Sequence, residues 1–184
     1  MKADWEKYLK FRCTGCGNCC RNTVVCITDA DIKRIVDGTG KSPADFVRFY
    51  DHDQIAVSRD DPLWVSFASG RAIMGLRAGH NRCGFLDNDT NRCNIYEHRP
   101  LTCRDHPFSI HFSDTGAIEK LWLSRIVPCP HEWDGNISRR ELTRIATWNE
   151  RQEDAYIKRV RIWNRQKQGA KTRPAFLRYL GFEV

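Results

Sequence analysis

Four cysteines stand within eight residues near the start of the chain, and thiols at this density are suited to metal or redox chemistry. They are Cys13, Cys16, Cys19 and Cys20. The first three form a Cys-x2-Cys-x2-Cys series, and the intervening Gly15 and Gly17 allow the backbone to turn so that the sulfurs converge. Zinc takes four ligands in a tetrahedron, and iron–sulfur clusters also take four thiolates. A fourth ligand must therefore come from another part of the chain.

Later cysteines can complete such a site. They are Cys83, Cys93, Cys103 and Cys129. Side chains on adjacent residues cannot easily reach one metal in the geometry of a Cys-x2-Cys pair, so we expect Cys20 to serve a second site or to bridge. The eight cysteines together make two four-sulfur sites. The ninth, Cys26, lies in an apolar run, where we predict that it packs as a small hydrophobic residue.

The length of the chain and its cysteine usage argue against a disulfide framework. A chain of 184 residues can bury a core without crosslinks, and nine cysteines cannot all pair within it. The first residues carry charges throughout, unlike a signal peptide, and no apolar run approaches the length of about 18 residues that a membrane span needs. We therefore predict a cytoplasmic protein that does not enter membranes. In a reducing cytosol, closely spaced cysteines are expected to bind metal or to do redox chemistry.

Several segments around these cysteines follow one another in a recognisable order. They are 13–20 (CTGCGNCC), 83–86 (CGFL), 93–96 (CNIY), 99–104 (RPLTCR) and 107–108 (PF), followed by Cys129. In this order they resemble the YkgJ-type cysteine-cluster proteins, a family of zinc- or iron-chelating CxxCxxCC domains. The resemblance implies that these cysteines bind metal, and it implies little about a reaction. His106 departs from the pattern, which leads us to expect an aromatic or apolar residue there, and the tail beyond about residue 135 lies outside the match.

The ligand set leaves zinc and iron open in equal measure. A Cys-x2-Cys-x2-Cys series with a remote fourth cysteine is similar to the loops of bacterial ferredoxins, and Cys129-Pro130 repeats their Cys-Pro ending. These features favour an iron–sulfur cluster. Long spacings such as that between Cys83 and Cys93 are also common in structural zinc sites.

Other residues are expected around the metal centre. Arg99 and Arg104 are suited to donate hydrogen bonds to the negative charge of a thiolate site. His131 follows Cys129 closely and is an alternative ligand in place of one cysteine. The segment 87–91 begins like a calcium loop but lacks the required later residues, so we predict instead the turn of a hairpin that brings two cysteines together.

The elements that must position these side chains indicate an α+β fold. Thr28 or Asp29 can cap a short helix that continues to about residue 36, and Ser42 can cap a second one. Between these helices and the C-terminal part, short apolar runs such as 63–68 and 118–123 are separated by turn residues. They predict a small antiparallel sheet with irregular loops around the cysteine-rich metal centre.

The C-terminal part is predicted to be helical and basic. A capping-box pattern at Ser138 begins a long helix that extends to about Gly169, in one piece or two. The net charge of the whole chain is +7, and residues 139–184 hold twelve Lys and Arg against five Asp and Glu. We therefore divide the chain into a cysteine-cluster metal-binding domain, 1–135, and a basic helical extension packed on it, 136–184.

The sequence leaves three functions open. The first is a metal-binding protein that holds zinc or iron, and the second is an iron–sulfur enzyme or electron-transfer protein. The third is a nucleic-acid-binding module with a structural metal, because 158–167 interleaves basic and aromatic residues. For that segment we favour an amphipathic helix that packs Val160 and Trp163 inward. The sequence assigns no catalytic residue, substrate or protein partner.

Overall fold

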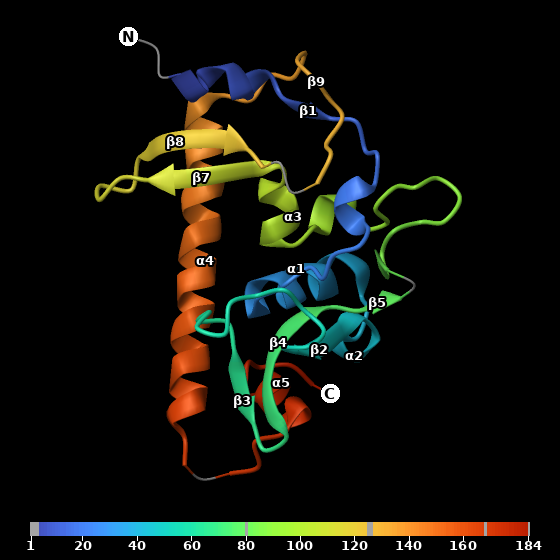
Figure 1. Ribbon diagram of the computed structural model, residues 1–184, viewed down its shortest axis with the longest axis vertical. Helices are drawn as coiled ribbons and strands as arrows, with labels where there is room; N and C mark the ends of the chain where they lie inside the picture. Colours follow the sequence, from blue (N-terminus) through green and yellow to red (C-terminus); the bar gives the residue numbers. More distant parts are fainter. Residues whose placement is uncertain (1–3, 80, 125–126, 168, 184) are drawn as a thin grey trace.

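Helices and small antiparallel sheets combine in an α+β arrangement, as the sequence predicted (Figure 1). A computed structural model describes residues 4–79, 81–124, 127–167 and 169–183. The helices, of which those named η are 3-10 helices, are η1 (Asp4–Lys10), η2 (Asn18–Cys20), α1 (Asp29–Thr39), α2 (Pro43–Phe46), η3 (Tyr96–His98), α3 (Leu101–Asp105), α4 (Arg139–Arg165) and α5 (Arg173–Tyr179). The strands are β1 (Arg12–Cys13), β2 (Val47–Asp51), β3 (Val65–Phe67), β4 (Gly70–Leu76), β5 (Ala78–Gly79), β6 (Arg82–Cys83), β7 (Phe108–Phe112), β8 (Ile118–Leu123) and β9 (His131–Glu132).

The main hydrophobic core is built on the antiparallel sheet β2-β4-β3. In this sheet Val47 of β2 lies opposite Leu76 of β4, and Phe49 lies opposite Met74. All four side chains are buried, which is expected where β-branched, aromatic and other apolar residues face a covered side of a sheet. Helices and cysteine-bearing loops therefore pack against this sheet in one hydrophobic core.

The other strands form two-stranded pairs, namely β1 with β9, β5 with β6, and β7 with β8. The predicted run 63–68 contains β3, whereas 118–123 is β8 and pairs with β7 in a different sheet. The predicted small antiparallel sheet is thus present as several small sheets. The later strands are separated from β2, β3 and β4 by the cysteine-bearing loops that follow β4 in the chain.

The two predicted N-terminal caps are both present. The side chain of Thr28 accepts a hydrogen bond from the backbone N–H of Asp31 at 3.3 Å, and Asp31 accepts one in return from the N–H of Thr28 at 2.7 Å. This reciprocal capping satisfies N–H groups at the start of α1 that have no partner within the helix. Ser42 caps α2 in the same way, with Pro43 at the first position of the helix.

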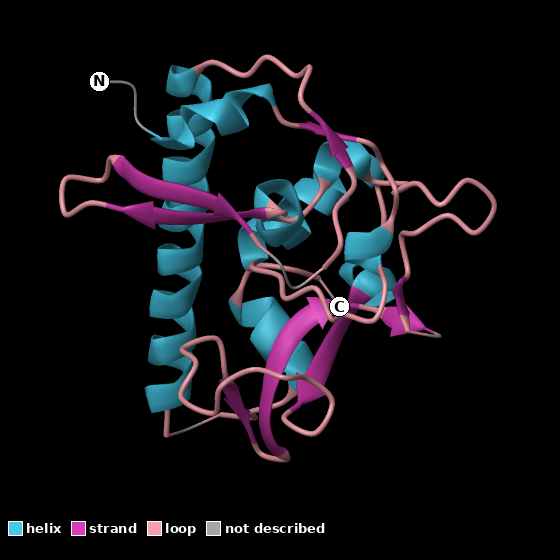
Figure 2. Ribbon diagram, turned by 45° about the horizontal axis from the view of Figure 1, so that its top comes forward, coloured by secondary structure: helices cyan, strands magenta, loops and turns pink. Residues whose placement is uncertain are grey.

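Helix α4 is one continuous helix of 27 residues along one side of the molecule, beside the β7–β8 hairpin and β3 (Figures 1 and 2). Ser138 caps it by accepting a hydrogen bond from the N–H of Glu141 at 3.1 Å, as the sequence predicted. Near its end the indole N–H of Trp163 donates to the carbonyl of Ser66 in β3 at 2.9 Å.

Within the described ranges no helix is both long enough and apolar enough to cross a membrane.

Candidate metal centre

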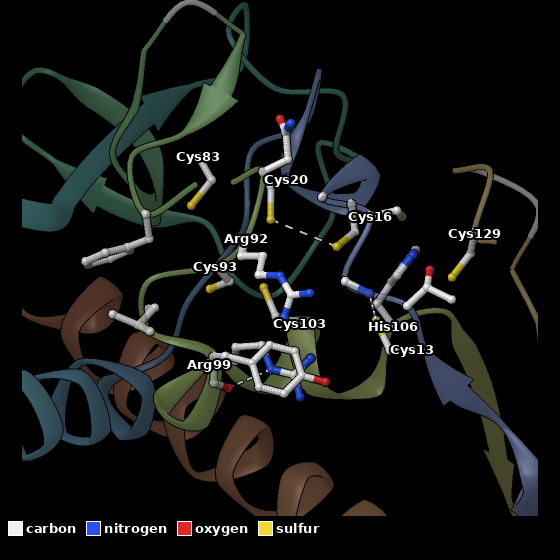
Figure 3. A pocket seen from close by; sticks show the side chains of 18 of the residues that line it. Cys13, Cys16, Cys20, Cys83, Arg92, Cys93, Arg99, Cys103, His106 and Cys129 are labelled. Carbon is white, nitrogen blue, oxygen red and sulfur yellow. Dashed lines mark hydrogen bonds between the residues drawn. The ribbon is translucent and has the colours of Figure 1, made fainter. Parts of the chain in front are cut away.

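A cavity of about 490 Å³ opens between the cysteine-bearing segments (Figure 3). All eight cysteines predicted to bind metal line it, namely Cys13, Cys16, Cys19, Cys20, Cys83, Cys93, Cys103 and Cys129. They come from the N-terminal loop, the segment that follows β4, helix α3 and the loop before β9. Cys26 does not line the cavity. The fold thus brings together the set of thiols that the sequence selected, from positions more than 100 residues apart.

The N-terminal loop depends on glycine. Gly17 has a φ of 73°, in the left-handed region, and a Cβ atom on it would lie 2.7 Å from the carbonyl oxygen of Asn91. Only glycine permits so close an approach between two backbones. The turn leads directly into η2, which carries Cys19 and Cys20. The close contact therefore holds this pair of thiols against the segment that carries Cys93.

Cys83 and Cys93 are connected by the predicted hairpin. Leu86 pairs with Cys93 in an isolated antiparallel bridge, and the N–H of Asp87 donates to the carbonyl of Arg92 at 2.9 Å. The Asp87 carboxylate accepts hydrogen bonds from within its own turn, including one from the N–H of Thr90 at 2.8 Å. These bonds hold the pKa of Asp87 below its usual value. The carboxylate that resembled a calcium ligand in sequence thus stabilises the turn.

Cys103 reaches the cavity from α3, and a buried carboxylate anchors this short helix. Asp31 is 1% exposed, and its second oxygen accepts a hydrogen bond from the N–H of Leu101 at 2.7 Å. One side chain therefore caps α1 and also holds the first residue of α3. Removal from water raises the pKa of Asp31, while these hydrogen bonds act in the opposite direction.

Cys129 is held close to the N-terminal loop by contacts between the two segments. Strand β1 pairs with β9, the hydroxyl of Thr14 donates to the carbonyl of Pro130 at 2.8 Å, and the amide of Asn18 donates to the carbonyl of Pro128 at 3.0 Å. These bonds span more than 100 residues of sequence and connect the last cysteine to the first.

His131, the predicted alternative ligand, does not line the cavity. Its Nδ1 lies 2.6 Å from the carbonyl oxygen of Cys129. Its ring packs between Phe11 and Trp133, with centroids 5.2 and 4.6 Å away. The imidazole is thus used to support the loop that carries Cys129.

The thiols surround a space rather than a point. Cys19 and Cys20 have their sulfurs 4.0 Å apart. Across the described part of the chain, no three Cys, His, Asp or Glu side chains form a group that could hold a single metal ion. The eight thiols lie around the cavity together with apolar and basic residues.

The eight thiols fall into two neighbourhoods. One packs on the main hydrophobic core and contains Cys19, Cys20, Cys83, Cys93 and Cys103. We call it the inner group, and we call the remaining three the outer group, Cys13, Cys16 and Cys129. Figure 3 shows Cys20, Cys83, Cys93 and Cys103 on one side of the cavity and Cys13 and Cys129 toward the other.

The neighbouring thiols that raise the pKa values of Cys20 and Cys129 follow the same division. A hydrogen bond with Cys19 and then burial raise the pKa of Cys20, and the nearby Cys83 and Cys103 add to the increase. Burial raises the pKa of Cys129 to about 11, with added contributions from Cys13, Cys16 and Cys19. Cys19 is the exception, since the hydrogen bond with Cys20 lowers its pKa to about 6. Cys19 acts on both neighbourhoods and lies between them.

Basic residues lie at the same cavity. Arg99 lines it as predicted, with its Nε donating to the carbonyl of Tyr96 at 2.8 Å. Arg104 does not line it, because its guanidinium lies over the ring of Trp148 at 5.9 Å. Arg12 and Arg92 also line the cavity, and sequence reasoning missed both. Each directly precedes a cysteine, which is the signal that could have identified them.

His106, which the sequence left without a role, also lines the cavity. Its Nε2 is buried and has no hydrogen-bond partner among the residues that the structure describes. Thiolates and imidazoles are the donors that zinc and iron prefer. The eight thiols and this unpartnered nitrogen thus fit a metal of that class on chemical grounds.

Comparison with known proteins agrees with this chemistry. Residues 12–130 match the family described as "CxxCxxCC: Putative zinc- or iron-chelating domain". An uncharacterized protein of Methanocaldococcus jannaschii, MJ0661, is 28% identical over 188 residues, which cover 99% of this chain and 78% of that protein. No solved structure matches the chain. Since the matched segment extends over more than half of the chain, from the first cysteine to the last, the chain belongs to the CxxCxxCC family of zinc- or iron-chelating domains.

Proposed function

We propose that the eight cysteines hold iron in the form of iron–sulfur clusters. The observation that carries the proposal is the cavity of about 490 Å³ around which all eight thiols lie. A zinc ion would hold its four sulfurs about 3.8 Å apart, as follows from Zn–S bonds of about 2.3 Å in a tetrahedron. A cluster instead places several iron and sulfide ions between its ligands and needs thiols around a volume. The size of the cavity supports the second arrangement.

The two neighbourhoods support two clusters in this proposal. The inner group supplies ligands to one, and the outer group supplies ligands to the other. Cys19 and Cys20 both belong to the inner group, with their sulfurs 4.0 Å apart, and in this proposal Cys19 can serve either cluster. When bound, such clusters accept and release single electrons.

The surrounding residues have two tasks in this proposal. Thiolate-bound clusters carry negative charge, so cations must lie nearby if the site is buried. Arg99 is suited to this task because its charge favours the thiolate forms of Cys19 and Cys93, although burial, the larger effect, raises the pKa of Cys93. Apolar neighbours such as Phe85 and Ile95 limit the access of water to the inner group. We propose that the protein is located in the cytoplasm, because a reducing compartment would keep the thiols free to bind metal.

The nucleic-acid alternative receives no support from the C-terminal helix. Val160 is fully buried and Trp163 is 5% exposed, so the indole is not free to stack on a base. This burial matches the amphipathic packing that the sequence favoured. An electron-transfer or enzymatic role remains compatible with the proposed clusters.

Anaerobic purification of the full chain tests the proposal. We expect a brown protein with broad visible absorption and about eight irons per chain, with an equal amount of acid-labile sulfide, as two four-iron clusters require. A colourless protein with about two zinc ions per chain would contradict it.

A further inference from the structure

His106 lies at the end of α3, three residues after Cys103. The backbone leaves the helix at His106 in an extended conformation (φ −62°, ψ 134°). The backbone N–H of His106 still donates to the carbonyl of Thr102 at 3.1 Å. The imidazole extends toward the cavity, and its Nε2 is buried without a hydrogen-bond partner in the described ranges. Buried polar atoms in folded proteins almost always have a partner, and a bound ion is a recognised partner where no protein group is available.

The position of His106 relates it to the outer group. Figure 3 shows its imidazole on the side of the cavity that carries Cys13 and Cys129, away from Cys83 and Cys93. Helix α3 thus presents Cys103 to the inner group, and His106, where the helix ends, lies toward the outer group. The outer group has three thiols of its own, one fewer than a four-ligand centre needs.

No other side chain of the lining offers the same chemistry. Among the described residues around the cavity there is no Asp or Glu, and His106 is the one histidine. His131 is excluded because its ring packs against Phe11 and Trp133 outside the cavity. Cys19 is the alternative fourth donor, but its sulfur contacts that of Cys20 and it packs on the main core with the inner group.

We propose that Nε2 of His106 is a metal ligand, the fourth donor beside Cys13, Cys16 and Cys129. This inference rests on the proposed function and specifies the ligands of one of its two centres. The neutral imidazole would keep its proton on Nδ1 and use the lone pair of Nε2. Cys19 then binds with the inner group or bridges the two. A neutral nitrogen ligand makes the outer centre less negative, so it becomes the more easily reduced of the two.

Pulsed EPR of the anaerobically purified, reduced full chain tests this assignment. We expect a strong ¹⁴N hyperfine coupling of the size found for a directly bound nitrogen. It should be lost in His106→Phe and kept in the matched control His111→Phe, because His111 is an exposed residue of β7 that does not line the cavity. In His106→Gly, added ¹⁵N-imidazole should restore the coupling as a ¹⁵N signal, which keeps the test valid if the Phe variant folds poorly.

The outcomes separate this inference from the proposed function. Full iron content without a strong nitrogen coupling in the unmodified chain, or with a coupling that persists in His106→Phe, overturns the role of His106 alone. A weak coupling, as from a hydrogen bond to a thiolate, overturns it as well. Zinc in place of iron overturns the cluster proposal. In that case a nitrogen neighbour in the zinc X-ray absorption spectrum that is lost in His106→Phe would still support the ligand.

Discussion

At the scale of single residues, Cys26 shows how one thiol differs from the other eight. Its backbone pairs with Gly75 in an isolated bridge, and its side chain lies outside the cavity. Burial raises its pKa to about 11, so it stays protonated at neutral pH. Cys26 is half-buried, and a neutral thiol there is suited to pack as a small hydrophobic group, which stays a prediction from the sequence.

Replacing two cysteines one at a time should separate ligands from packing residues. We expect Cys20→Ala to lose about half of the bound iron, because one of two clusters loses a ligand. Cys26→Ala should keep the full iron content, at a cost of about 1 kcal/mol in the free energy of unfolding from the lost packing. Iron and sulfide analysis of the two variants measures the difference. Unchanged iron in Cys20→Ala would show that the division into two cysteine-bound centres is wrong.

Asp105 is expected to make stability depend on pH. It is partly buried, Asn149 donates to it at 2.5 Å, and burial raises its pKa to about 6, above its usual 3.8. The folded chain therefore holds this proton more tightly than the unfolded chain. Its contribution to stability is complete below pH 4 and is lost as the pH rises through 6, a change of up to about 3 kcal/mol.

The variant Asp105→Asn should remove this dependence, because its amide is neutral and can still accept from Asn149. We expect it to match the unmodified chain near pH 4 and to exceed it by about 2–3 kcal/mol at pH 7.5. Urea unfolding of the metal-free, reduced chain at several pH values measures the difference. Asp37→Asn on the exposed side of α1 is the control and should show no such trend. An equal difference at every pH would contradict the assigned pKa.

At the scale of elements, Asp31 connects two helices that are 70 residues apart. Asp31→Ala leaves the N–H groups of Thr28 and Leu101 without their partner, and each such loss costs about 1–3 kcal/mol. We expect a loss of about 3–5 kcal/mol in the free energy of unfolding and a lower iron content, because α3 carries Cys103. Chemical unfolding together with iron analysis provides the measurement.

Asp45→Ala is the matched control for this prediction. Asp45 has the same place in the capping box of α2, but among the described residues its carboxylate has no bond to another helix. We expect a loss of about 1 kcal/mol and unchanged iron. Equal losses in the two variants would mean that the bond between Asp31 and Leu101 does not anchor α3.

Local elements were predictable from the sequence, whereas their meeting points were not. The caps at Thr28, Ser42 and Ser138 and the hairpin after Cys83 depend on residues within a few positions of one another, and all are present. The choice of eight cysteines followed from spacing and resemblance, but their two neighbourhoods depend on which loops meet in the fold. Arg104 illustrates the same limit, because it was expected beside the thiols but does not line the cavity. Successive helical residues point about 100° apart, and in α3 it is Cys103 that faces the cavity.

At the scale of the whole molecule, α4 joins two hydrophobic clusters. Ala146 packs with Ile118 and Leu121 of β8 in a small cluster, while Tyr156, Val160 and Trp163 pack in the main core. Helix α5 folds back onto the same core (Figure 1), where Phe176 is fully buried. We therefore propose that residues 136–184 form an extension whose packing the cysteine-bearing part requires.

Two tryptophans of α4 allow this proposal to be tested within one helix. Trp163 is 5% exposed, contacts Phe176 at a centroid distance of 5.2 Å and donates to Ser66, whereas Trp148 is 38% exposed. Trp163→Ala should cost about 3–5 kcal/mol in the free energy of unfolding, because it leaves a cavity in the main core and an unpaired carbonyl. Trp148→Ala should cost about 1 kcal/mol, since it loses mainly the exposed contacts with Arg34 and Arg104.

Urea unfolding of both variants, followed by circular dichroism, gives the comparison. Because the inner cysteines pack on the same core as Trp163, we also expect Trp163→Ala to release iron to a chelator faster than Trp148→Ala does. If the two variants had equal stability and equal rates of iron release, the C-terminal helices would be dispensable to the metal centre. The prediction follows from a shared core, in which loosening one side of the packing loosens the thiols that rest on the other.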